Sequence, residues 1–220
     1  MTDFQDLSRD ISRLGREHSD RGLEASDLNV DPFVQFGLWL EEALNAGIVL
    51  PNAMALATAG ADAVPTARMV LLKGFDDRGF VFFSNYESRK GRELAANPNA
   101  ALVFYWPEVE RQVGITGGVS RVEKSESEDY FKSRPLGSRI GAWASPQSEV
   151  IIGRKELEDR AGELLDRYPE GDIPLPANWG GYRLIPSRFE FWQSRPNRLH
   201  DRFRYELGET GGWSNDRLAP

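Results

Sequence analysis

Residues 188–205 read Arg-Phe-Glu-Phe-Trp-Gln-Ser-Arg-Pro-Asn-Arg-Leu-His-Asp-Arg-Phe-Arg-Tyr, a stretch rich in aromatic and cationic side chains. The first part, 189–192, alternates like a strand, 194–197 reads as a turn, and 198–205 alternates again, which predicts a β-hairpin. Side chains of a strand point alternately to its two faces, so one face of the second strand would carry Arg198, His200, Arg202 and Arg204. Guanidinium groups bind phosphate or carboxylate bidentately, and imidazole titrates near neutral pH, so this face predicts an anion site.

An exposed edge strand would explain the same cations, because charged side chains protect sheet edges from aggregation. The stretch also resembles the C-terminal signature of the FMN-dependent pyridoxine/pyridoxamine 5′-phosphate oxidases. That signature is Glu-Phe-Trp-Gln, here 190–193, then a four-residue spacer and Arg-Leu-His-Asp-Arg, here 198–202. The resemblance covers nearly all of 31–220, and it implies a split β-barrel that dimerises with FMN held between the subunits.

Composition limits the possible classes of protein. The chain has 220 residues, a net charge of -7 and a pI near 5.0, which favours one domain and disfavours nucleic acid as a partner. It has no cysteine, so disulfides, thiolate metal sites and a cysteine nucleophile are excluded, and we expect no metal. The N-terminus has no apolar run like a signal peptide or membrane span, so we expect a cytoplasmic protein with no membrane contact.

The spacing of apolar residues predicts the elements. A period near 3.6 and capping signals indicate helices at 4–17, 31–47, 89–96, 126–133 and 148–167. Alternation and short apolar runs indicate strands at 53–58, 67–73, 79–85, 100–106, 112–122, 181–185, 188–193, 198–205 and 212–217. Consecutive strands with short connections predict a mainly β fold with flanking helices (α+β), its antiparallel sheet closed into a barrel. We expect a mobile segment at 1–30 and a single domain at 31–220.

Residues 84–90 end a strand and start a helix, which predicts a phosphate site. Free N–H groups at a helix start, the helix dipole, hydroxyls and two cations all favour an anion there. An ordinary capped helix is the alternative, although Arg and Lys in a first turn oppose the dipole. The resemblance implies that four of these residues hold the FMN phosphate: Ser84, Ser88, Arg89 and Lys90.

Residues 68–73 read as a buried strand with a cation at each end. Arg68 and Lys73 differ in parity, so a regular strand would point them to different faces unless a bulge or a site shared by two subunits intervened. Cations at strand ends also commonly reach solvent without any function. The resemblance implies flavin contacts from Arg68, Met69, Val70 and Leu71, and a contact of Lys73 with the substrate phosphate.

Residues 130–141 place a phenol, a guanidinium and a hydroxyl at intervals of four. These are Tyr130, Arg134 and Ser138, which a continuous helix would put on one face, but Pro135 and Gly137 break the helix. A helix end followed by a surface turn is the alternative. The resemblance implies that all three bind substrate, the last two around its phosphate.

The resemblance assigns the remaining site residues. FMN contacts are implied for Phe83, Gln112, Gln147, Ser148, Trp192 and Arg202. Arg198 and His200 are implied to orient the substrate ring and to be the catalytic pair. Three departures stand out: Gly15 and His18 replace an Arg and a Tyr of the N-terminal segment, Leu50 replaces an acidic residue, and Phe83 replaces a tyrosine of some members.

The expected function is therefore oxidation of pyridoxine 5′-phosphate and pyridoxamine 5′-phosphate to pyridoxal 5′-phosphate with FMN and O2, in a homodimer. Two alternatives remain. One is a related flavin oxidase of the phenazine pathway, and the other is a non-catalytic module that binds FMN or pyridoxal phosphate. Retention of Lys73, Arg134 and Ser138 together favours a phosphorylated substrate.

Overall fold

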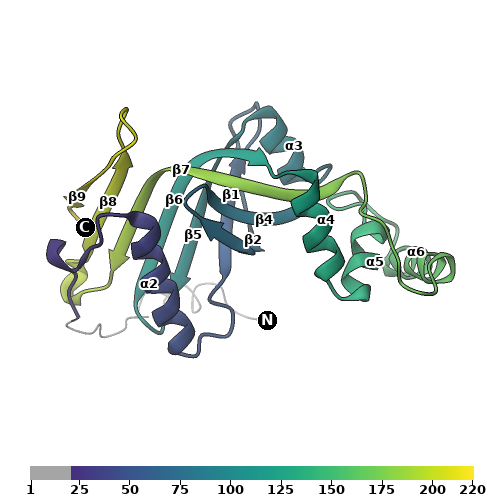
Figure 1. The fold of residues 1–220 in the computed structure, drawn as a ribbon, viewed down its shortest axis with the longest axis horizontal. Helices are drawn as coiled ribbons and strands as arrows, with labels where there is room; N and C mark the ends of the chain where they lie inside the picture. The colour runs from purple at the N-terminus through teal and green to yellow at the C-terminus, as the bar shows by residue number, and fades with distance from the viewer. Residues whose placement is uncertain (1–20) are drawn as a thin grey trace, which may run out of the picture.

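The computed structural model describes residues 21–220, which form a curved antiparallel sheet with helices at its sides (Figure 1). Within these residues the sheet has nine strands in the order β2-β1-β5-β6-β7-β4-β3, with β8 paired to β7 and β9 to β8. The strands are β1 (Ala53–Ala59), β2 (Pro65–Leu71), β3 (Gly74–Asp76), β4 (Gly79–Asn85), β5 (Asn99–Trp106), β6 (Arg111–Arg121), β7 (Trp179–Gln193), β8 (Asp201–Leu207) and β9 (Trp213–Leu218). The predicted mainly β split barrel is confirmed.

Helices flank this sheet. They are α2 (Pro32–Asn45), α3 (Arg89–Ala96), α4 (Lys124–Ser133), α5 (Leu136–Ala144) and α6 (Arg154–Arg167), with short 3-10 turns η1 (Ala25–Asp27) and η2 (Pro196–Arg198). The start of α2 is as predicted, since the Asp31 carboxylate accepts a hydrogen bond from the Phe33 N–H at 2.8 Å. The predicted helix at 4–17, Gly15 and His18 lie outside the described residues, and the domain boundary at residue 30 stays a prediction.

An aromatic core joins α2 to the sheet. The ring of Phe36 lies 4.9 Å from that of Phe80 and 5.0 Å from that of Phe104. Phe36, Trp39 and Ala43 are buried along one face of α2, at the spacing of a helix packed on a core. A second apolar cluster packs α4, α5 and α6 around Trp179 at the start of β7. The sheet and the helical layer are thereby fixed to each other at that end of β7.

The hairpin at the C-terminus differs from the prediction. Residues 181–185 and 188–193 belong to one continuous strand, β7, which accommodates a register shift opposite Thr116 and Gly117 of β6. The return strand begins at Asp201 rather than residue 198, because Asn197 and Arg198 both adopt left-handed backbone conformations and reverse the chain. The prediction that Arg198 and His200 share a strand face with Arg202 and Arg204 is therefore wrong.

The helices after β6 also differ in their limits. α4 begins two residues before the predicted 126–133 helix, with Glu123 in the capping position. Pro135 breaks the helix as expected, since α4 ends at Ser133, but Gly137 does not, because α5 begins directly after Pro135 and contains Gly137. α6 begins only at Arg154, and residues 148–153 form an irregular segment in which Ser148 has a φ of 76°.

Candidate active site

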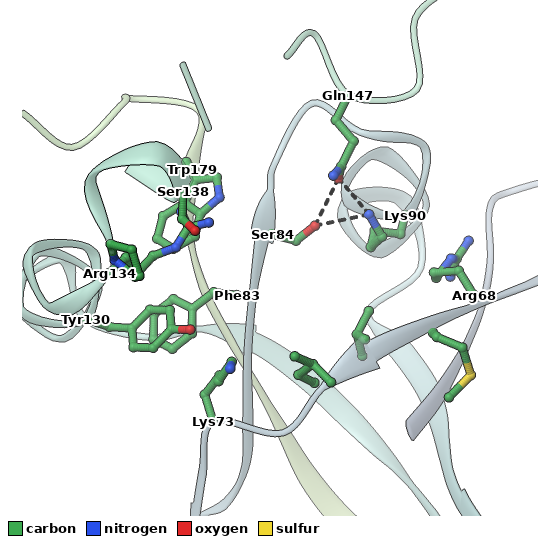
Figure 2. A pocket seen from close by; sticks show the side chains of 14 residues that line it. Arg68, Lys73, Phe83, Ser84, Lys90, Tyr130, Arg134, Ser138, Gln147 and Trp179 are labelled. Atoms are coloured by element: carbon green, nitrogen blue, oxygen red, sulfur yellow. Dashed lines mark hydrogen bonds between the residues drawn. The ribbon is translucent and has the colours of Figure 1, made fainter. Parts of the chain in front are cut away.

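A cavity of about 640 Å³ opens between the barrel and the helical layer (Figure 2). Its walls come from β2, β4, α3, α4, α5 and the start of β7. The lining residues are Arg68, Met69, Val70, Leu71, Lys73, Phe83, Ser84, Lys90, Tyr130, Arg134, Pro135, Ser138, Gln147 and Trp179. All but Pro135 and Trp179 are residues that the sequence had assigned to cofactor or substrate.

One side of the cavity is a cradle of hydroxyl, amide and ammonium groups. The Lys90 ammonium donates to Gln147 Oε1 at 2.7 Å, Ser84 Oγ at 3.1 Å and Ser88 Oγ at 3.3 Å. Ser88 caps α3, and its side chain accepts from the Gly91 N–H. The ammonium is thus held at a helix start among neutral oxygens, which is the environment of an anion site.

Ser148 and Arg89 border this cradle. The backbone N–H of Arg89 donates to Ser148 Oγ at 3.1 Å, which links the irregular segment after α5 to the first turn of α3. Burial, and then the nearby charge of Arg68, lower the pKa of Lys90 to about 8. An anion bound beside Lys90 would relieve both effects, because it stabilises the ammonium form.

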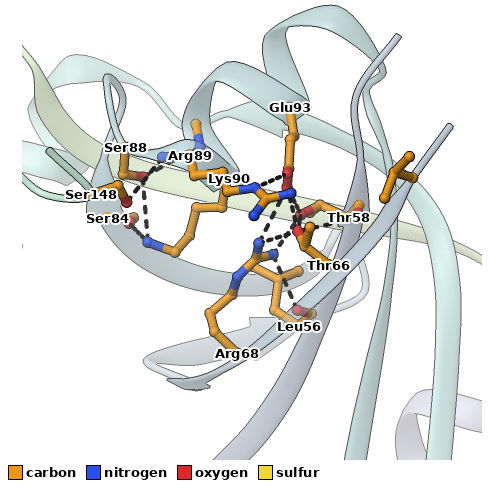
Figure 3. A network of polar contacts seen from close by, with 12 residues as sticks. Leu56, Thr58, Thr66, Arg68, Ser84, Ser88, Arg89, Lys90, Glu93 and Ser148 are labelled. Carbon is orange, nitrogen blue, oxygen red and sulfur yellow. Dashed lines mark hydrogen bonds and ion pairs between the residues drawn. The ribbon is translucent and has the colours of Figure 1, made fainter. Parts of the chain in front are cut away.

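Arg68 lies beside the cradle in a polar network that Figure 3 shows. Its guanidinium donates to the Leu56 carbonyl, to the hydroxyls of Thr58 and Thr66, and to Glu93 Oε2 at 3.2 Å. β2 ends at Leu71, so Lys73 no longer follows the alternation of the strand. Arg68 and Lys73 therefore line one cavity despite their different parity, and no bulge within β2 is needed.

The opposite side of the cavity combines an aromatic wall with cations. Phe83 and Tyr130 stack with ring centroids 3.9 Å apart, and Trp179 stacks on Phe83 at 5.5 Å. The Arg134 guanidinium lies over the Trp179 ring at 4.7 Å. Burial lowers the Arg134 pKa, and Arg134 Nη1 is buried without a hydrogen-bond partner among residues 21–220. A buried donor of this kind is an open position for an anionic ligand.

Lys73 completes this side, and Ser138 lies near Arg134 (Figure 2). The Lys73 ammonium is 5.9 Å from the centroid of the Tyr130 ring. Pro135 lies at the junction of α4 with α5, so Tyr130 comes from one helix and Ser138 from the next. The cavity thus has two cationic sides, one at α3 and one at the α4–α5 junction.

Five predicted residues lie elsewhere, toward the far end of β7. Gln112 of β6 is paired in register with Trp192 of β7, whose ring is 4.6 Å from that of His200. His200 Nδ1 accepts from the backbone N–H of Arg195 at 3.1 Å. The residues concerned are Gln112, Trp192, Arg198, His200 and Arg202. Trp179 in the cavity and Trp192 are 13 residues apart along β7, a contour length of about 40 Å at ~3.3 Å per residue.

The cationic row predicted on β8 is already neutralised in part. Arg202 pairs with Glu190 at 2.9 Å, and Arg204 pairs with Asp216 at 2.9 Å and with Glu206 at 3.5 Å. These carboxylates belong to neighbouring strands or to β8 itself, and the sequence interpretation did not consider them. The row is therefore not a free anion site on its own.

Sequence reasoning missed Trp179, Pro135 and the partners of Arg68. Trp179 follows the Pro-rich connector at 174–176 and begins a strand, a weak signal that gives no indication of its stacking partners.

No helix in residues 21–220 is both long and apolar enough to cross a membrane. In the same residues, nowhere do three or more His, Asp or Glu side chains gather as a metal ion would require.

Two family models match the chain. One is described as pyridoxamine 5′-phosphate oxidase and matches residues 40–168. The other is described as the pyridoxine 5′-phosphate oxidase C-terminal dimerisation region and matches residues 179–220. Pyridoxine/pyridoxamine 5′-phosphate oxidases of Burkholderia mallei (strain SAVP1) and Burkholderia thailandensis are each 55% identical over 222 residues, covering 100% of both chains.

Solved structures show the same likeness. PhzG from Burkholderia lata 383, in complex with tetrahydrophenazine-1-carboxylic acid, superposes with a TM-score of 0.84 at 34% identity, over 90% of this chain and 98% of that one. A pyridoxamine 5′-phosphate oxidase-related, FMN binding protein from Nostoc punctiforme PCC 73102 gives a TM-score of 0.69 at 17% identity, over 87% and 99%. The second comparison bears on the fold alone.

Proposed function

The chain belongs to the pyridoxamine 5′-phosphate oxidase family, and from that premise we propose that it is an FMN-dependent oxidase of pyridoxine 5′-phosphate and pyridoxamine 5′-phosphate. Oxidation of the alcohol consumes O2 and yields pyridoxal 5′-phosphate and H2O2. Oxidation of the amine also consumes water and releases ammonia. The proposed role is vitamin B6 biosynthesis and salvage in the cytoplasm.

Two separate sets of anion-binding side chains in one cavity carry this proposal. Lys90 with its hydroxyl neighbours lies on one side, and Lys73 with Arg134 lies on the other. Neither Lys90 nor Arg134 pairs with a carboxylate within residues 21–220. A flavin mononucleotide and a phosphorylated substrate bound together need two such phosphate positions.

The α3 side fits the FMN phosphate. Ser84, Ser88 and Lys90 present hydroxyls and an ammonium at a helix start, and Arg89 adds a second cation. Met69, Val70 and Leu71 line the cavity between this cradle and Lys73, where the ring system would lie. FMN, when bound, supplies the hydride acceptor and passes electrons to O2.

The α4–α5 side fits the substrate phosphate. Arg134 Nη1 is an unfilled donor, and Lys73 and Ser138 add an ammonium and a hydroxyl to the same side. Phe83, Tyr130 and Trp179 add a stacked aromatic wall to this side. Holding the phosphate here fixes the substrate's reacting carbon toward the flavin, and this positioning is the protein's main contribution.

A second copy of the chain is proposed to supply the residues at the far end of β7. Residues 179–220 match a dimerisation region, which supports a homodimer, and they contain Trp192, Arg198, His200 and Arg202. Trp192 is 13 residues along β7 from the cavity residue Trp179, and Arg202 and His200 lie beside Trp192, which supports a contribution from the second subunit. In the proposed dimer, Arg198 and His200 of the partner subunit orient the substrate ring, and Trp192 of the partner subunit, with Gln112 and Arg202, contacts FMN.

An anaerobic titration tests the proposal. Protein reconstituted with FMN should lose its flavin absorbance band when pyridoxamine 5′-phosphate is added without O2, and recover it in air with formation of pyridoxal 5′-phosphate. Unphosphorylated pyridoxamine is the matched control, and we expect it to reduce the flavin far more slowly. Failure to retain FMN after reconstitution would instead support a non-catalytic module that binds pyridoxal phosphate.

A second candidate function rests on the likeness to PhzG at 34% identity. A phenazine-type oxidase would keep the FMN side and have no need of a substrate-phosphate side. The same titration separates the two functions. The alternative would be established if a reduced phenazine carboxylate reduced the bound flavin and pyridoxamine 5′-phosphate did not. The substitution Arg134→Ala should raise KM for pyridoxamine 5′-phosphate about tenfold or more only if the phosphate binds there.

A further inference from the structure

Glu93 is a buried carboxylate of α3 that no step of the proposed reaction uses. It has a side-chain exposure of 10%, and it lies behind the cavity rather than in its wall. Oε2 accepts hydrogen bonds from Thr58 and Thr66, each at 2.6 Å, and from Arg68 at 3.2 Å. Oε1 accepts from Arg89 Nε at 2.9 Å. One carboxylate therefore binds two cations assigned to the cofactor and two hydroxyls (Figure 3).

The two threonines form a relay between Glu93 and Arg68. Thr58 of β1 and Thr66 of β2 are partners in the strand register. Each hydroxyl donates its proton to Glu93 and accepts an N–H from the Arg68 guanidinium. Because a hydroxyl has one proton, this arrangement fixes both rotors, and it leaves the guanidinium one well-defined orientation.

The charge balance also depends on Glu93. Arg68 comes from β2, and Arg89 and Lys90 come from the first turn of α3; burial and then the charge of Arg68 lower the pKa of Lys90, whereas the charge of Glu93 raises it. Burial raises the pKa of Glu93, but hydrogen bonds from Thr58, Thr66, Arg89 and Arg68 outweigh it and lower that pKa to about 2. The carboxylate is thus ionised at any working pH, and it offsets the repulsion within the group.

We propose that Glu93 is a positioning residue for the flavin nucleotide, which holds Arg68 in its binding orientation through the Thr58–Thr66 relay and Arg89 through a direct hydrogen bond. This inference rests on the proposed FMN site and adds a residue that contacts neither phosphate nor flavin. A purely structural alternative is that Glu93 only ties α3 to β1 and β2. A purely electrostatic alternative is that Glu93 repels the FMN phosphate.

The substitution Glu93→Gln separates these three cases, because each predicts a different change in the affinity for FMN. Loss of positioning should weaken FMN binding, since the amide donates as well as accepts and cannot satisfy four donors. Loss of a repelling charge should tighten FMN binding. Loss of a structural tie alone should lower the unfolding temperature of the apoprotein and leave the Kd for FMN unchanged.

The experiment is a titration of apoprotein with FMN, followed by quenching of flavin fluorescence, together with the thermal unfolding of each apoprotein. We expect a Kd about tenfold or more higher for Glu93→Gln than for the unsubstituted chain. Glu158→Gln is the matched control, because it makes the same change in an exposed ion pair with Arg154 on α6, and its Kd should not change.

A second pair of variants tests the relay without removing the charge. Thr66→Val keeps the shape and loses the hydroxyl, so it should raise the Kd severalfold, whereas Thr66→Ser keeps the hydroxyl and should restore affinity. An unchanged or lower Kd in both Glu93→Gln and Thr66→Val would overturn the inference. If the unsubstituted chain does not bind FMN, the proposed function fails first, so the two failures are distinguishable.

Discussion

At the scale of the residue, Lys90 makes FMN binding dependent on pH. Its pKa is lowered to about 8 by burial and by Arg68, and a bound phosphate would raise it again. Binding therefore takes up a proton above pH 8, so affinity should hold between about pH 7 and 8 and then fall by at most about tenfold per pH unit. Fluorescence titration of the apoprotein across this range measures the effect. Lys90→Arg, which stays charged, should show little fall.

The same fall in Lys90→Arg would show that another group titrates, and would contradict this assignment.

The sequence could predict Ser84, Ser88 and Lys90, because a cap, a helix start and local cations lie within seven residues. It could not predict Thr58, Thr66 and Glu93. Their convergence depends on the β1–β2 register and on the packing of α3 against β1, neither of which local spacing determines.

At the scale of the element, the turn before β8 sets the position of Arg198. Asn197 and Arg198 have φ values of 58° and 61°, a region that costs most residues about 1–2 kcal/mol but that Asn tolerates. Asn197→Ala should therefore lower kcat/KM for pyridoxamine 5′-phosphate about fivefold, and Asn197→Gly should preserve it. Steady-state kinetics with saturating FMN decide this. Equal kcat/KM in all three proteins would mean that the turn does not hold Arg198 for the reaction.

Elements were predictable where one local signal dominated. The cap and proline at 31–32 predicted the start of α2, and alternation predicted most strands within two residues. The prediction failed where tertiary contacts overrode local signals. Gly137 was read as a helix breaker, yet it lies inside α5, because the buried Ile140 and Ala144 pack that helix against α6. The alternating residues 198–200 were read as strand, although the left-handed turn excludes them from it.

At the scale of the whole molecule, strand periodicity predicted the antiparallel barrel, because alternation reports which face of each strand is buried. It could not predict where the site residues meet. The cations at 68–73 and at 198–202 look alike in sequence, but the folded chain places the first group at the cavity and the second near the other end of β7. Resemblance to a family supplied the expectation that a second subunit joins them.

A shared site predicts that two inactive subunits can restore each other. Arg134→Ala removes a cavity residue and Arg198→Ala a hairpin residue, so each homodimer should bind FMN and have little turnover at a pyridoxamine 5′-phosphate concentration well below the raised KM of Arg134→Ala. A heterodimer, co-expressed with two tags and purified through both, contains one site with both arginines and one with neither. Its turnover per dimer should be about half that of the unsubstituted homodimer, by the two-fold symmetry. A heterodimer of Arg134→Ala with Lys73→Ala, both altered in the cavity, should stay inactive. No recovery in the first heterodimer would mean that cavity and hairpin do not form one site across subunits, because isologous exchange leaves no other arrangement in which they meet.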